Sequence, residues 1–242
     1  MKNKIKTIAI IGGGPCGCAL ATLLKRKGFK VAVFYLEKRP EIIVGESLVP
    51  AIVPMLRALG VEDEVKSYST YKPGASVWVS KDEEATSPFS YGGGNLPPYA
   101  YNVPRVKFDK TIFENAVKEG VQFFNLAAKI EKTGNNDELK LSEETIKGTN
   151  GYFDAQPDLI VDATGRSRTI SRLLDIPTKQ GYRKDVALFA HLSGAEKIEP
   201  YNIHLHRLEK GWNWRIPLPD RTSVGVVINP EHLKKYGTTK EE

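Results

Sequence analysis

The sequence predicts an α/β protein in which a parallel sheet is interleaved along the chain with an antiparallel sheet. Near the start, an apolar run at residues 4–11 leads directly into a glycine-rich turn and then into a helical pattern at residues 18–27. Near the end, four strand-like segments follow one another between short turns, at residues 186–192, 202–208, 212–218 and 222–228. The first pattern is typical of parallel strands joined by helices, and the second of antiparallel hairpins.

The early turn has the sequence pattern of a dinucleotide site. It reads Gly12-Gly13-Gly14-Pro15-Cys16-Gly17, which fits G-x-G-x-x-G, and a second strand at residues 29–36 follows the helix. The first glycine permits the tight turn, the second lets the backbone approach a pyrophosphate, and the third lets helix and strand pack closely. We therefore expect a Rossmann-like unit whose cofactor contacts come from Gly12, Gly14, Pro15, Cys16 and Gly17.

The expected ribose contact departs from the usual pattern. A dinucleotide site normally has an acidic residue at the end of the second strand. Counting along residues 29–36 puts Tyr35 at that position, with Glu37 two residues later. The Tyr35 hydroxyl and the Glu37 carboxylate both stay open as ribose ligands, and we take Glu37 as the cofactor-binding candidate.

The middle of the chain contains both helical and strand patterns. The helices are expected at residues 51–59, closed by Gly60, and at residues 108–120. The remaining segments are expected to be a strand at 75–79, a surface loop at 87–98, a strand at 121–126, an exposed hairpin at 129–153 with its turn at 134–136, and a buried parallel strand at 159–161.

Composition excludes several classes of function. The net charge is +6, but the basic residues are scattered among acidic ones, so we expect a solvated surface and no nucleic-acid binding. No apolar stretch approaches the ~20 residues of a membrane span. The chain enters a strand at once, so we expect no signal peptide and a cytoplasmic protein. Cys16 and Cys18 are too close for an ordinary disulfide, and we interpret them as small side chains of the turn.

Four further motifs resemble those of flavin-dependent halogenases and of related FAD-dependent monooxygenases. Residues 45–50 fit G-E-[SA]-x-x-P, and residues 212–217 fit W-x-W-x-I-P, the best-known halogenase marker. Residues 103–109 resemble V-x-R-x-x-F-D, and residues 162–167 resemble D-[AG]-x-G-x-S. The chain is thus similar to the p-hydroxybenzoate hydroxylase-like superfamily over nearly its whole length.

This resemblance implies a fold and a cofactor. It implies a Rossmann-like parallel FAD-binding sheet, formed by residues 1–70 and 105–180, and an antiparallel substrate-domain sheet, formed by residues 71–104 and 181–242. The residues implied to lie at the FAD are Glu46, Ser47, Arg105, Asp162 and Gly165. From the residues alone, Arg105 also fits a surface position at a helix entry, and Asp162 also fits a simple turn cap.

The resemblance also implies oxygen-dependent halogenation through a flavin hydroperoxide and hypohalous acid. FAD would be reduced by a separate flavin reductase, and the substrate would be a small aromatic molecule. Lys72 matches the lysine that holds hypohalous acid, a role that favours a partly desolvated amine of lowered pKa. Trp212 and Trp214, two residues apart on a strand, would form one wall beside the flavin. We expect these three residues to be catalytic.

Other interpretations stay open. The chain could be a non-halogenating FAD monooxygenase or dehydrogenase of the same fold. A Gly-Asp pair expected after the last strand is absent, so it could also be a fragment or a truncated, non-catalytic remnant with weak flavin retention. His204 and His206 share one face of a strand without an evident third ligand, so no metal site is expected. His191 is expected only to pack in the substrate sheet.

Overall fold

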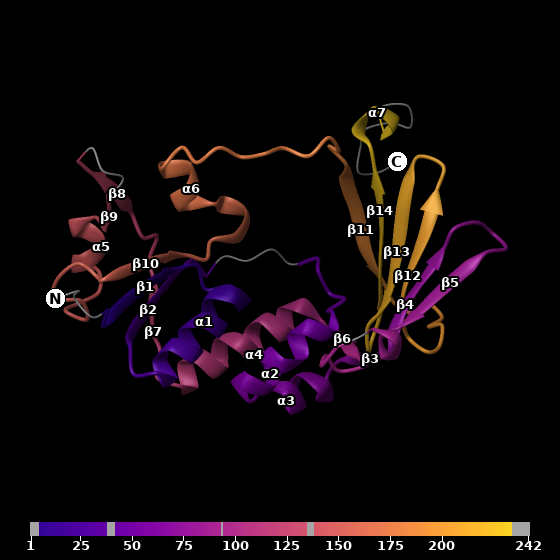
Figure 1. The fold of residues 1–242 in the computed structure, drawn as a ribbon, viewed down its shortest axis with the longest axis horizontal. Helices are drawn as coiled ribbons and strands as arrows, with labels where there is room; N and C mark the ends of the chain where they lie inside the picture. The colour runs from indigo at the N-terminus through magenta and orange to yellow at the C-terminus, as the bar shows by residue number, and fades with distance from the viewer. Residues whose placement is uncertain (1–4, 38–41, 93, 135–137, 234–242) are drawn as a thin grey trace. The chain divides into compact units, whose positions relative to one another are not determined.

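The computed structural model describes residues 5–37, 42–92, 94–134 and 138–233 (Figure 1). The chain forms two compact units, one of Met1–Ile42 with Phe108–Thr178 and the other of Ile43–Lys107 with Lys179–Glu242. Residues 43–70, which the sequence analysis assigns to the FAD-binding domain, belong instead to the second unit. The physical reason is backbone pairing within that unit, because Ser47 forms a β-bridge with Asn102.

The first unit contains the expected parallel sheet. Its strands, in the order β10-β1-β2-β7, all run parallel. Their bounds are Thr7–Ile11 for β1, Lys30–Tyr35 for β2, Gln122–Asn125 for β7 and Leu159–Asp162 for β10. The expectation that β10 is buried is wrong: in the described sheet it is an edge strand, and Leu159 is 40% exposed.

Both faces of this sheet are covered (Figure 1). One face carries α1 (Pro15–Arg26) and α4 (Arg105–Lys118), with the Phe113 ring of α4 packed on Tyr35 and Phe123. On the other face, Ala9, Ile11, Ala32 and Phe34 form a core with residues after β7. Alternate side chains of each strand therefore serve opposite layers.

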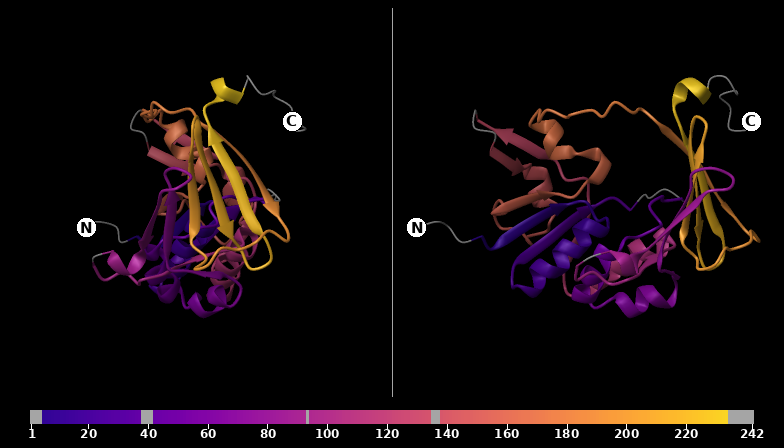
Figure 2. Two further views of the ribbon diagram at one scale, coloured as in Figure 1. Left: turned by 90° about the vertical axis from the view of Figure 1, so that its right-hand side faces the viewer. Right: turned by 45° about the vertical axis from the view of Figure 1, so that its right-hand side comes forward.

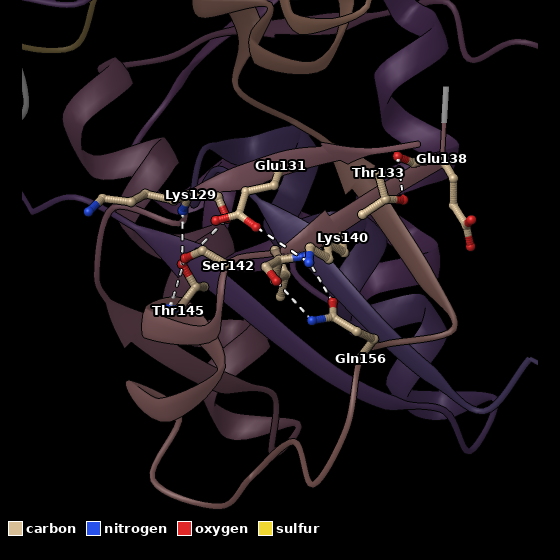
Figure 3. Close-up of polar contacts among 9 residues, drawn as sticks. Lys129, Glu131, Thr133, Glu138, Lys140, Ser142, Thr145 and Gln156 are labelled. Carbon is tan, nitrogen blue, oxygen red and sulfur yellow. Dashed lines mark hydrogen bonds and ion pairs between the residues drawn. The ribbon is translucent and has the colours of Figure 1, made fainter. Parts of the chain in front are cut away.

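The segment expected to be one long hairpin is a shorter hairpin followed by a helix (Figure 3). Strands β8 (Ile130–Thr133) and β9 (Glu138–Leu141) pair, and α5 spans Glu143–Lys147. Most of the predicted turn at 134–136 lies outside the described residues. Ser142 starts the helix, because its Oγ accepts a hydrogen bond from the Thr145 N–H at 3.2 Å. Gln156 then pairs with both the N–H and the carbonyl of Leu141, each at 2.8 Å.

Two short helical segments follow β10 in the first unit. These are the 3₁₀ turn η3 (Gly165–Ser167) and α6 (Thr169–Leu173).

The second unit contains a six-stranded sheet in the order β11-β14-β13-β12-β4-β5 (Figure 2). The bounds are Gly74–Trp78 for β4, Glu84–Pro88 for β5, Val186–Leu192 for β11, Ile203–Leu208 for β12, Gly211–Pro217 for β13 and Thr222–Ile228 for β14. The four late strands pair antiparallel, as predicted. Two details differ from the sequence-based expectation. Strand β4 runs parallel to β12, so the sheet is mixed. The first two residues of the expected loop at 87–98 form the end of β5, which pairs with β4.

The remaining elements of the second unit are short. They are η1 (Pro50–Ile52), α2 (Val53–Leu59), α3 (Glu62–Ser67), β3 (Thr70–Lys72), η2 (Phe89–Tyr91), β6 (Ala100–Asn102) and α7 (Pro230–Leu233). Gly60 ends α2 with φ 77°, as predicted from the sequence. Glu62 ties α3 to β6, because its Oε1 accepts hydrogen bonds from the hydroxyls of Tyr99 and Tyr101.

Candidate functional site

The glycines of the early turn differ in what surrounds them. Gly12 has φ 119°, and a Cβ there would lie 2.3 Å from the Ala163 carbonyl oxygen. A Cβ on Gly17 would lie 2.0 Å from the Gly12 carbonyl oxygen, whereas nothing lies within 4 Å of a Cβ on Gly14. Gly12 and Gly17 therefore serve the turn and the packing, and Gly14 leaves space on the outer side. This division agrees with the three roles assigned from the sequence, and contact with a cofactor stays a prediction.

An open hollow of about 290 Å³ lies beside this turn in the first unit. Helix α1 begins at Pro15 after Gly14, and no side chain caps it. The free N–H groups and the positive end of the helix dipole favour an anion. The hollow is lined by Cys16, Asp162, Ala163, Gly165, Arg168 and Ser171. A basic side chain, a helix N-terminus and a glycine without a Cβ together fit the phosphates of a dinucleotide.

Asp162 holds the loop that follows β10. Its Oδ1 accepts hydrogen bonds from the N–H and the hydroxyl of Thr164, at 2.9 and 2.6 Å. Its Oδ2 accepts one from the Ile170 N–H at 2.8 Å. Burial raises the pKa of this carboxyl, but the hydrogen bonds from Thr164 and Ile170 outweigh it, and the pKa is lowered overall. The turn-cap interpretation describes these contacts, and a role for Asp162 at the cofactor stays a prediction.

The expected ribose position is occupied by an aromatic group. A Cβ on Gly13 would lie 2.7 Å from the Cβ of Tyr35, so this glycine is also required by packing. The motif G-x-G-x-x-G allows any residue at position 13, so it does not reveal that packing against Tyr35 requires a glycine there. The Glu37 carboxylate accepts a hydrogen bond from the Asn125 side chain at 3.3 Å and is exposed. Its contact with a ribose, which the sequence analysis expects, stays a prediction.

Lys72 is a charged residue of the second unit whose side chain is buried. It ends β3 and is only 2% exposed. Its Nζ donates hydrogen bonds to Ser47 Oγ, at 2.7 Å, and to the Leu48 carbonyl, and it lies 5.1 Å from the centre of the Phe89 ring. Burial lowers the pKa of Lys72 to about 8. The structure therefore gives this amine the desolvation that the sequence analysis expects.

Residues 44–46 are held by two further side chains of the same unit. The Glu46 carboxylate is 2% exposed, and its Oε1 lies 2.8 Å from His191 Nε2 on β11. Arg105 Nη1 donates hydrogen bonds to the carbonyls of Val44, at 2.7 Å, and Gly45, at 3.4 Å. The sequence predicts only packing for His191, since no local pattern could reveal its partner across 145 residues. Arg105 has a structural role here, and its contact with a flavin stays a prediction.

The two tryptophans of the late motif lie together. Their ring centres are 5.9 Å apart, so they share one face of β13, as their spacing predicts. Trp214 is buried, its Nε1 donates to Ser223 Oγ at 3.4 Å, and its ring covers Gly225, where a Cβ would lie 2.2 Å from it. The pair forms a continuous aromatic surface, and its role as a wall beside the flavin stays a prediction.

The histidines of β12 and the two cysteines have structural surroundings. His206 on β12 stacks on Trp78 with ring centres 5.8 Å apart. Within the part of the chain that the structure describes, no three His, Cys, Asp or Glu side chains gather as a metal site would require. The Cys18 thiol donates to the Gly13 carbonyl at 3.3 Å, and Cys16 is exposed. Among the described residues, no helix is long and apolar enough to cross a membrane.

The fold is that of an α/β protein in which a glycine-rich turn joins the first strand of a parallel sheet to the first helix. The model of the tryptophan halogenase family matches residues 7–98 and 93–241, and the chain belongs to this family. The chain spans about half the length of the curated relatives it matches. It is 32% identical over 241 residues to the flavin-dependent halogenase armH3 of Armillaria mellea, covering 94% of this chain and 47% of that protein. Flavin-dependent halogenase otaD of Aspergillus carbonarius is also 32% identical, with coverages of 96% and 51%.

Solved structures confirm the α/β fold class. A flavoprotein/dehydrogenase from Cytophaga hutchinsonii aligns with a TM-score of 0.81 at 30% identity, over 97% of this chain and 58% of that one. The myxobacterial chondrochloren halogenase CndH, an FAD-dependent halogenase, aligns with a TM-score of 0.74 at 26% identity, over 96% of this chain and 55% of that one.

Proposed function

We propose that this chain is an FAD-dependent oxidoreductase of the halogenase type, in which Lys72 holds hypohalous acid for transfer to a small aromatic substrate. The observation that supports this proposal most directly is the contact of the buried Lys72 amine with Ser47 Oγ and the Leu48 carbonyl. Both partners are neutral. A lysine kept for stability normally reaches water or pairs with a carboxylate, so its burial among neutral groups favours a chemical role.

The first unit supplies groups that fit FAD. The turn of Gly12, Gly14, Pro15, Cys16 and Gly17 would hold the pyrophosphate, because its helix N-terminus is open and Gly14 leaves room for the approach. Glu37 would bind the ribose, and Gly165 would lie near the cofactor. Reduced FAD, when bound, would supply two of the four electrons that reduce O₂, and the halide ion would supply the other two as it becomes hypohalous acid, with water as the second product.

The second unit supplies groups that fit the transfer step. Glu46, Ser47 and Arg105 would contact the cofactor, as the family motifs imply. The amine of Lys72 would bind the hypohalous acid and keep it from escaping. The aromatic substrate would then lose a ring proton and gain the halogen, and the hydroxyl of the acid would leave as water. Trp212 and Trp214 would exclude water from the path of the acid.

The proposal includes a separate flavin reductase as partner and a cytoplasmic location. The relatives support halogenation, because several with more than a quarter of their residues identical to this chain are named as halogenases. The 1H-pyrrole-2-carbonyl-[peptidyl-carrier protein] chlorinase of Pseudomonas fluorescens, at 26% identity, shows by its name an aromatic substrate for one of them.

A second candidate is a non-halogenating FAD oxidoreductase of the same fold. It is favoured by the flavoprotein/dehydrogenase of Cytophaga hutchinsonii, whose backbone fits this chain with the higher TM-score of the two solved structures above. A buried lysine beside a flavin could also serve a proton transfer in such an enzyme.

One assay separates these candidates. The purified chain would be supplied with FAD, a flavin reductase with NADH, oxygen, bromide and an electron-rich phenol, and the products analysed by mass spectrometry. Halide-dependent brominated product supports the proposal. Halide-independent oxidation of the phenol favours the second candidate, and absence of FAD binding by fluorescence titration favours a non-catalytic chain.

A further inference from the structure

We propose that the Ser47 hydroxyl is the positioning group that holds the Lys72 amine in both its charged and its neutral form. This inference deepens the proposed function, because it concerns the residue that would bind hypohalous acid. It rests on the direct contact of Ser47 Oγ with Lys72 Nζ at 2.7 Å.

Backbone pairing fixes both residues on one small sheet. Lys72 on β3 pairs with Ala100 of β6, and Ser47 bridges to Asn102 of the same strand. Hydrogen bonds from Leu48 N–H to the Tyr101 carbonyl and from Val103 N–H to the Glu46 carbonyl complete this bridge, at 2.9 and 2.7 Å. Residues directly opposite each other and those two apart on a strand share one face. Lys72 and Ser47 therefore project from the same face, on the two sides of β6.

The partners of the amine differ in what they can do. The Leu48 carbonyl can only accept a hydrogen bond, so it serves an N–H of either form of the amine. The Phe89 ring attracts only a positive charge. The Ser47 hydroxyl can accept from the ammonium and, by rotating, donate to the lone pair of the neutral amine. Among the contacts of Lys72 described above, only the Ser47 hydroxyl can both accept a hydrogen bond from the ammonium and donate one to the lone pair of the neutral amine.

Charged groups on neighbouring elements have other partners. Glu46, next to Ser47, is paired with His191, and Glu62 on α3 is bound by Arg57 and two tyrosines. Burial is the cause of the lowered pKa of Lys72. The hydroxyl of Ser47 is therefore the main group whose removal would change the protonation of Lys72 without changing its burial.

The test is a pH titration of the chain labelled with ¹³C at lysine Cε, followed by NMR. Lys72 is identified by its loss in K72M and by its pKa, which lies below that of exposed lysines. Because a hydrogen bond to a charged donor is about twice as strong as a neutral one, S47A should lower the pKa of Lys72 further, by roughly one unit. S47T keeps a hydroxyl and should restore the original value. S142A, which removes the capping hydroxyl of a buried serine in the first unit, should leave the pKa of Lys72 unchanged.

An unchanged pKa of Lys72 in a folded S47A would overturn the inference. So would S47T behaving as S47A, because the effect would then come from packing. A shift in S47A that S47T reverses supports the inference even if the wild-type chain makes no halogenated product. That combination would count against the proposed function alone, so the two failures can be told apart.

Discussion

His191 Nε2 on β11 lies 2.8 Å from the buried Oε1 of Glu46. The residue after Glu46 is Ser47, and its Oγ lies 2.7 Å from Lys72 Nζ on β3. Two consecutive side chains of one extended segment are thus bound from two different strands of the second unit. Arg105 holds the carbonyls just before them. The G-E-S motif is therefore a fixed support for the lysine amine, built from residues far apart in the sequence.

Removing His191 should destabilise the fold. H191A leaves the Glu46 carboxylate buried without this partner, and an unsatisfied buried acceptor costs about 2 kcal/mol. H191Q offers an amide donor and should recover part of the loss. Urea unfolding of the three proteins measures both effects. Equal stability of H191A and the wild type would show that Glu46 does not depend on His191.

Lys72 should lower the stability of the chain near neutral pH. Its pKa falls from the ordinary 10.5 to about 8 through burial, so between these values the unfolded chain binds a proton that the folded chain does not. Stability therefore rises with pH across this window, and below about 8 the fold carries the full cost of the buried charge. K72M should be more stable than the wild type by about 2 kcal/mol at neutral pH, with an advantage that shrinks toward pH 10.5.

The control for this experiment is K110M, which replaces an exposed lysine of α4. Its effect on unfolding should be small at every pH. If K72M lost stability at neutral pH while K110M did not, the amine would be contributing to the fold, and the argument that Lys72 is kept for chemistry would fail.

Two glycines of the early turn should respond differently to alanine. G17A places a Cβ 2.0 Å from a carbonyl oxygen and should cost about 3 kcal/mol of stability. Gly14 has φ −76° and open space around it, so G14A should change stability by less than about 0.5 kcal/mol. Because its methyl group would occupy the side from which a pyrophosphate approaches, G14A should weaken FAD binding at least about tenfold. Wild-type FAD affinity in G14A would remove the turn from the cofactor site.

The position of Trp214 should depend on Gly225. A Cβ at residue 225 would lie 2.2 Å from the indole ring, so G225A must displace the ring, at a cost of about 1–3 kcal/mol. The tryptophan emission spectrum should change with it. A Cβ on Gly181 would have nothing within 4 Å, so G181A serves as the matched control. Identical spectra of G225A and the control would contradict the described packing.

The sequence was informative wherever local pattern and physical role coincide. The strands with alternating or continuous apolar residues were placed within a few residues, and so were the glycine turn and the end of α2 at Gly60. The paired rings of Trp212 and Trp214 follow directly from strand periodicity. The burial of Lys72 also agrees with the environment that its motif implies.

Elements without such patterns could not be predicted. Strand β5 is polar and lies at a sheet edge, so it lacks apolar alternation. Helix α5 has only five residues, although Ser142 followed by two glutamates is an N-terminal signal that could have been found. The parallel pairing of β4 with β12 and the contact of His191 with Glu46 are long-range, and one sequence alone carries no record of which distant segments meet.

The central claim is tested most directly by comparing bromination in the wild type, K72A and K110A under the assay conditions described above, with FAD binding measured in each. The account predicts that all three bind FAD equally and that K72A alone loses brominated product, by about a hundredfold or more. Bromination by K72A at the wild-type rate would contradict it.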